Sequence, residues 1–165
     1  MKSGVAAIAA SFTLATIVVL TSVGTAQELP KAGTGTIHSG WKGTGTVTEV
    51  ADKHVYWVGT WSAVSFNDEG RGFLHRMAWT CPAVSDINNS LASMRGLCVL
   101  TDAQGDKIHG SWFNAGSLDK ELVGRFEMTT GTGKYAGIKG GWEIACSVIT
   151  VDSASCRQKY TYRLP

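Results

Sequence analysis

The chain has 165 residues, with 15 Lys or Arg against 13 Asp or Glu, so its formal net charge is +2. This near-neutral balance and a charged share of only 17% exclude a long charged coiled coil and leave no broad basic face for nucleic acid. The apolar share of 44% and six tryptophans exclude a disordered chain, and 20 glycines favour a compact, turn-rich β domain.

The N-terminal segment has the pattern of a secretory signal peptide. Lys2 precedes an almost continuous stretch of apolar and small residues over 4–20, and Gly24 and Ala26 are small residues just before Gln27. This order predicts cleavage after residue 26, an exported (periplasmic or secreted) domain over residues 27–165, and no membrane association after cleavage. The alternative is that the segment remains as a membrane anchor.

All four cysteines lie after the expected cleavage point. In an oxidising compartment an even number of cysteines favours two disulfides, and three pairings exist. We favour Cys81–Cys98 and Cys146–Cys156, because each pair flanks one plausible hairpin. The alternative is a zinc site of four thiolates, but the chain has no C-x-x-C pair, so no metal site is expected.

A short repeat opens the mature chain. Gly33-Thr34-Gly35-Thr36 recurs ten residues later as Gly43-Thr44-Gly45-Thr46. Because ten residues correspond to about one strand plus a turn, the repeat predicts a local duplication of a β unit.

From residue 54 onward the sequence predicts strands almost throughout, with turn signals about every ten residues. Residues 72–81 are expected to form a strand with Phe73, His75, Met77 and Trp79 on one face, and residues 81–91 to be irregular. The pattern predicts an all-β fold, a single antiparallel up-and-down barrel of about eight strands. The expected strands cover residues 32–41, 42–50, 54–66, 72–81, 94–101, 107–113, 121–129, 137–150 and 155–162.

The most distinctive stretch of the chain is TGTGKYAGIKG at residues 130–140. It resembles the GGTGxFxGxxG signature of the allene oxide cyclase and dirigent-like β-barrels, which are calycin-like, although Thr130 replaces the first glycine. The glycines allow positive φ or close backbone approach, and the aromatic residue is expected to act as an apolar plug. The expected structural-turn residues are Gly131, Gly133, Tyr135, Gly137 and Gly140.

The resemblance implies a barrel that forms dimers or trimers and steers the cyclisation or coupling of a reactive intermediate by the shape of its cavity. A rival is the lipocalin or avidin type of barrel, suggested by the G-x-W pattern of Gly59-Thr60-Trp61.

Three ionisable residues are weak candidates for catalysis: His75, Glu143 and Arg125. His75 is preferred because its expected face is otherwise apolar and aromatic, where it could serve as an acid or base; the alternative is a hydrogen-bonded core histidine. For Glu143 and Arg125 the alternative is a solvated outer face with cross-strand ion pairs. Whether the protein is an enzyme stays open, and no motif indicates a cofactor.

The large aromatic side chains favour a binding function, because such side chains line cavities for apolar ligands. We expect the exported barrel to bind an apolar or aromatic small molecule in its interior. The alternatives are the cyclase or dirigent-like enzyme, and a structural or interaction module whose barrel is filled. The candidate cavity residues are Trp57, Trp61, Phe73, Met77, Trp79, Trp112 and Trp142.

Overall fold

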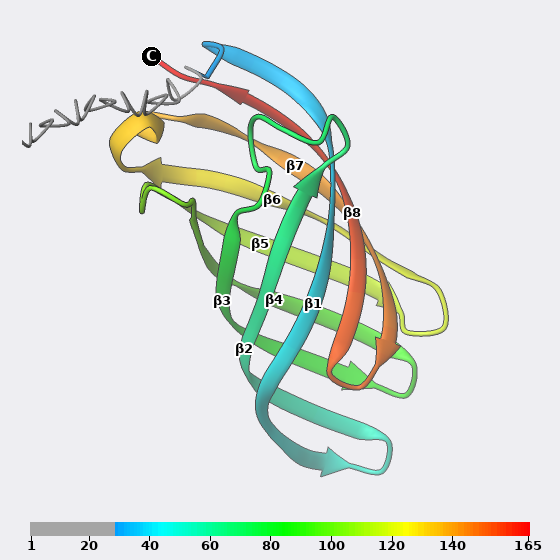
Figure 1. Ribbon diagram of the computed structural model, residues 1–165. Coiled ribbons are helices and arrows are strands. Elements are labelled where there is room, and N and C mark those ends of the chain that lie inside the picture. Colours follow the sequence, from blue (N-terminus) through cyan, green and yellow to red (C-terminus); the bar gives the residue numbers. More distant parts are fainter. Residues whose placement is uncertain (1–28) are drawn as a thin grey trace, which may run out of the picture.

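A computed structural model describes residues 29–165 as one closed barrel of eight antiparallel strands, each hydrogen-bonded to its neighbours in sequence (Figure 1). The last strand pairs with the first and closes the barrel. The predicted fold class is therefore confirmed, and the expected signal peptide lies outside the described residues. The strands are β1 (Ala32–Ala51), β2 (His54–Asn67), β3 (Ala78–Asn88), β4 (Leu91–Thr101), β5 (Lys107–Ser117), β6 (Glu121–Gly131), β7 (Lys139–Thr150) and β8 (Ser153–Arg163).

Both copies of the GTGT repeat lie in the single long strand β1, so the predicted duplication of a strand and a turn is wrong. The repeat instead alternates between the two faces of the strand. A Cβ atom on Gly35 would lie 2.5 Å from the Tyr160 hydroxyl oxygen, and one on Gly43 would lie 3.0 Å from Trp61 Cζ3. The glycines therefore leave room on the inner face for aromatic rings of the neighbouring strands, while the threonines face outward.

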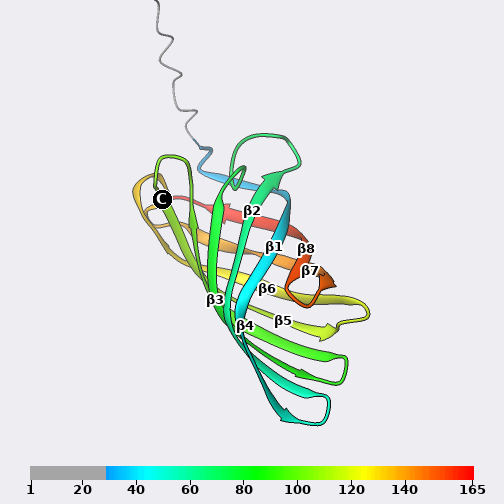
Figure 2. The ribbon, with the colours of Figure 1, turned by 60° about the horizontal axis from the view of Figure 1, so that its bottom comes forward.

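The strand β1 is longer than the barrel wall. Its pairing with β8 ends at Lys42, which forms an ion pair with Asp152 in the β7–β8 turn. Beyond this point β1 pairs only with β2. The β1–β2 hairpin therefore projects past the other hairpins at this end of the barrel (Figure 2).

The opposite end, where the C-terminus lies (Figure 1), is closed by the β2–β3 loop. Phe73, Leu74 and Met77 of this loop are buried, and the Phe73 ring stacks on Tyr162 at a centroid distance of 4.0 Å. Ser65 Oγ and Asn67 Nδ2 donate hydrogen bonds to the carbonyl oxygens of Leu74 and Phe73. We call residues 68–77 the plug loop.

Two assignments around β3 were wrong. Residues 72–77 form the plug loop rather than a strand, because Leu74 and Arg76 adopt φ values of 61° and 58°, which extended backbone does not allow. Residues 82–88, expected to be irregular, belong to β3. Pro82 lacks an N–H, and the β3–β4 bridges skip Cys81 and Pro82. The Cys81–Cys98 disulfide spans this gap.

Both disulfides have the predicted pairing, Cys81–Cys98 and Cys146–Cys156. Each joins neighbouring antiparallel strands, with Cα atoms 4.1 Å apart.

The segment 130–140 is a structural turn between β6 and β7. Gly133, Gly137 and Gly140 have positive φ values of 52°, 75° and 134°. Gly131 lies at the end of β6 and packs against Tyr135. A Cβ atom on Gly131 would lie 2.3 Å from the Tyr135 carbonyl oxygen. Tyr135 is buried and donates a hydrogen bond to Asp102 at 3.2 Å. Its ring also contacts the plug loop, 6.2 Å from the Phe73 ring.

Candidate functional site

A cavity of about 60 Å³ lies inside the barrel, toward the hairpin end and away from the plug loop. Four indole rings dominate its wall: Trp41 from β1, Trp61 from β2, Trp79 from β3 and Trp112 from β5. The apolar lining is completed by aliphatic side chains, by Met94, Cys98 and Phe126, and by the Cys146–Cys156 disulfide. The cavity is partly open to solvent.

The wall of the cavity carries no ionisable side chain. Its polar side chains are the amides of Asn114 on β5 and Gln158 on β8, which are 5% and 1% exposed. Burial of an isolated charge costs much more free energy than burial of an apolar group. The site is therefore suited to uncharged ligands, and it offers no group for general acid–base chemistry.

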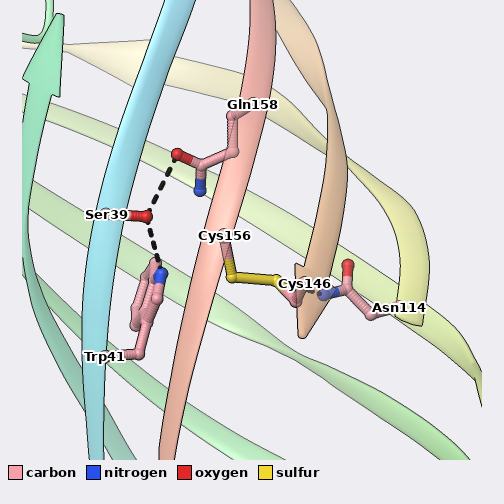
Figure 3. Close-up of a disulfide and its surroundings, with 6 residues drawn as sticks. All are labelled: Ser39, Trp41, Asn114, Cys146, Cys156 and Gln158. Atoms are coloured by element: carbon pink, nitrogen blue, oxygen red, sulfur yellow. Dashed lines mark hydrogen bonds between the residues drawn. A yellow bond between two sulfur atoms is a disulfide. The ribbon is translucent and has the colours of Figure 1, made fainter. Parts of the chain in front are cut away.

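One hydrogen-bonded chain runs along the β1–β8 wall, beside the disulfide (Figure 3). The indole N–H of Trp41 donates to Ser39 Oγ at 2.7 Å, and Ser39 Oγ donates to Gln158 Oε1 at 3.2 Å. Trp41 Nε1, Ser39 Oγ and Gln158 Oε1 therefore have partners within the protein.

Other polar atoms of the lining residues have no such hydrogen bond. Asn114 Nδ2 contacts Cys146 Sγ at 3.5 Å, but Asn114 Oδ1 is buried without a hydrogen-bond partner. The indole nitrogens of Trp61 and Trp112 are likewise buried and unpartnered. Most buried polar atoms in folded proteins have a partner, so these three atoms are exceptions, and neighbouring atoms of the protein enclose them.

The seven predicted cavity residues separate into three groups. Trp61, Trp79 and Trp112 line the cavity. Trp57 lies beyond Trp61 on the projecting hairpin, half-buried, with its ring 5.5 Å from the Trp61 ring. The other three residues lie outside the cavity lining. Phe73 and Met77 belong to the plug loop, and the Trp142 ring stacks on the Phe126 ring at a centroid distance of 3.9 Å.

The catalytic candidates all lie away from this cavity. His75 is a half-buried residue of the plug loop, and its Nδ1 accepts a hydrogen bond from the Asn67 backbone N–H at 3.3 Å. Arg125 and Glu143 are paired across β6 and β7 on the outer face, and both are exposed. Arg125 forms an ion pair with Glu127 at 3.1 Å. The structure therefore does not bring the three candidates together.

Trp41, Asn114 and Gln158 line the cavity but were not among the predicted cavity residues. A signal for the two amides was present, because each alternates with inward residues of its strand: Asn114 with Trp112, and Gln158 with Cys156 and Tyr160. An amide on an otherwise apolar strand face indicates a polar contact inside a barrel.

Within residues 29–165, no group of three or more His, Cys, Asp or Glu side chains is placed to hold a metal ion. No helix in this part of the chain is long and apolar enough to span a membrane.

No protein-family model matches the chain, and no curated protein matches it. Among solved structures, the chain is similar to the pterocarpan synthase dirigent protein, with a TM-score of 0.51 and 8% sequence identity. The match covers 91% of this chain and 100% of the dirigent protein. At this identity the likeness shows a shared fold, and the chain has a dirigent-like barrel.

Proposed function

We propose that this protein is an exported binding barrel that takes an apolar or aromatic small molecule into the cavity at the hairpin end. The observation that carries the proposal is the lining: four indole rings and no ionisable side chain surround the space. Ligand sites are typically apolar with a few placed polar groups. The signal-like N-terminal pattern and the two disulfides support export.

The cavity volume limits how much of a ligand can be buried inside the barrel. About 60 Å³ is far below the roughly 300–1,000 Å³ of pockets that enclose drug-sized ligands. A small ring or an aliphatic end therefore enters the barrel, and the rest of a larger ligand lies at the mouth. There the projecting hairpin places Trp57 next to Trp61.

A binding test uses the tryptophans themselves as reporters. Native mass spectrometry of protein purified from its own compartment should show a bound small molecule, and a panel of apolar compounds should change the tryptophan fluorescence. A protein that is empty and does not respond to any compound of the panel contradicts the proposal.

A variant that fills the cavity provides a second test, and a neighbouring alanine provides its matched control. Ala154 lines the cavity, whereas Ala145 on the neighbouring strand β7 lies outside its lining. We expect Ala154→Leu to weaken binding at least tenfold, because the added atoms occupy the cavity. Ala145→Leu should leave the affinity unchanged. Equal effects of the two variants would place the ligand elsewhere.

A second candidate function is favoured by the dirigent fold neighbour: the cavity steers a reactive intermediate by its shape. Such work needs apolar walls rather than an acid or base, and these walls carry no ionisable group. The test is chiral chromatography of the dimers formed when a simple phenol is oxidised by one electron in the presence of the protein. A racemic product at saturating protein contradicts this function.

A further inference from the structure

One edge of strand β1 has no neighbouring strand over its last part. The pairing of β1 with β8 ends at Lys42, whereas its pairing with β2 continues to Ala51. Within residues 29–165, residues 44–50 therefore have β2 on one side and no strand on the other, and we call them the free edge. We propose that the free edge pairs antiparallel with the same edge of a second copy of this chain and joins two barrels into a dimer. The proposal does not depend on the proposed ligand binding.

The backbone of the free edge has hydrogen-bonding groups that a partner strand can use. In an antiparallel ladder, every second residue turns its N–H and its C=O to the same neighbouring strand. The Gly43 N–H donates to the Asp152 carbonyl oxygen at 2.7 Å, on the side of β8. By the same alternation, Gly45, Val47 and Glu49 turn their backbone groups to the free side, and all three residues are exposed.

The sequence of the free edge does not protect it from pairing with another strand. Exposed edges of natural sheets are usually short, or they carry proline, lysine or inward-pointing charges. The free edge has the sequence TGTVTEV, which contains neither proline nor lysine. Its threonines and valines are β-branched and favour extended backbone. The composition of the free edge therefore favours the addition of a further strand.

The order of residues in the free edge fits a second copy of itself. A two-fold axis at Val47 places the two Val47 residues opposite one another, Thr46 opposite Thr48, and Gly45 opposite Glu49. Cross-strand pairs of β-branched residues stabilise antiparallel strands. Each Glu49 carboxylate lies opposite a glycine, so the two negative charges do not face one another. This register forms about six backbone hydrogen bonds between the two copies.

The dimer would also bury apolar side chains on one face of the joined sheet. Val47 is 53% exposed and lies directly across from Trp57 on β2. The Trp57 ring packs over Gly45 on the same face. In the dimer, Trp57 and Val47 of both copies form one apolar row, and the burial of apolar area stabilises the contact. Because Trp57 lies next to Trp61, this row also brings the two cavity mouths together.

Sedimentation equilibrium tests for the dimer, and one substitution tests its edge. We expect a reversible equilibrium between monomer and dimer at protein concentrations up to about 1 mM. Val47→Lys should raise the dissociation constant of the dimer at least tenfold, because it places two like charges opposite one another. A protein that stays monomeric over this range overturns the proposal.

Val58→Lys is the matched control for this substitution. Val58 is a valine of the same hairpin and is 51% exposed, but it pairs with Thr46 on one side and with Val84 on the other. The control should therefore change the dissociation constant of the dimer less than twofold. Equal effects of Val47→Lys and Val58→Lys would place the contact elsewhere and overturn the proposal.

Amide hydrogen exchange tests the edge in the unmodified protein. The Val47 N–H faces the free side, whereas the Thr46 N–H faces β2 in monomer and dimer alike. Raising the protein concentration should slow exchange at Val47 at least tenfold and leave exchange at Thr46 unchanged. A dimer with unchanged exchange at Val47 overturns the proposal. Protection of Val47 that appears only when an extended Thr-Val repeat peptide is added would assign the edge to a different partner and likewise overturn it.

Discussion

The indole ring of Trp57 lies against Gly45, in the space that a side chain at position 45 would occupy. A Cβ atom on Gly45 would be 2.7 Å from Trp57 Cε2 and 2.4 Å from the Val58 carbonyl oxygen. The contact joins the two strands of the projecting hairpin, where β1 has no pairing with β8. The stability of the projecting hairpin therefore depends on the packing of the Trp57 ring over Gly45.

Gly45→Ala should destabilise the protein by about 1–3 kcal/mol, because the added methyl group overpacks the contact. The free energy of unfolding in urea measures the effect. Gly40→Ala on the same strand is the control, since a Cβ there meets no atom within 4 Å. A stability of Gly45→Ala equal to that of Gly40→Ala would show that the hairpin tolerates the side chain.

Phe73 anchors the plug loop to the barrel through contacts with three tyrosines: Tyr135, Tyr160 and Tyr162. Phe73→Ala should lower the free energy of unfolding by about 3–5 kcal/mol, the usual cost of truncating a buried phenylalanine. The matched control is Phe66→Ala, because Phe66 lies at the same end of the barrel but is 52% exposed. Thermal or urea unfolding of the two variants compares them, and similar losses would mean that the plug contributes little.

The Cys81–Cys98 disulfide lies where Pro82 interrupts the bridges between β3 and β4. Replacement of both cysteines by alanine should lower the free energy of unfolding by about 2–4 kcal/mol, the typical contribution of a disulfide. The measurement is urea unfolding without reductant. As a control, a reducing agent should lower the free energy of unfolding more in the wild type than in this variant. The wild type loses two disulfides on reduction, whereas the variant loses only Cys146–Cys156. An unchanged midpoint in the variant would contradict the prediction.

Stability should fall at high pH because of Tyr135. Burial and the neighbouring Asp102 carboxylate raise the pKa of Tyr135 above its ordinary value of 10.0. The folded protein therefore holds the phenolic proton more tightly than the unfolded chain does. This contribution is complete below pH 10 and is lost as the pH rises further, because the unfolded tyrosine then ionises first.

Urea unfolding at pH 8, 9, 10 and 11 tests this linkage. The free energy of unfolding should fall less steeply above pH 10 in Tyr135→Phe than in the wild type. Tyr160 and Tyr162, whose pKa values burial also raises, remain in both proteins. Parallel curves for the two proteins would mean that Tyr135 does not contribute.

Alternation of residues along the strands was enough to predict most of the barrel, but it failed where φ or long-range packing decides. Residues 72–77 alternate like a strand, yet Leu74 and Arg76 adopt positive φ because hydrogen bonds from Ser65 and Asn67 hold the loop in the barrel end. Conversely, Pro82 reads as a strand breaker, but a disulfide stabilises its strand. Alternation of residues by itself indicates neither the hydrogen bonds that hold the loop nor the effect of the disulfide on the strand.

Strand period and turn spacing are local properties, so the sequence alone was enough to predict the all-β class and the up-and-down barrel. Cysteine positions favoured the two disulfide pairings that the structure shows, but they did not select them among the three possible pairings. Which tryptophans line the cavity, and which indole nitrogens lack a partner, depends on contacts between strands that form only in the folded barrel. A ring in the barrel interior acquires neighbours from strands far away in sequence, as Trp79 on β3 does from Trp41 on β1 and Trp142 on β7. The candidate site is a property of barrel closure, which brings those strands to one interior.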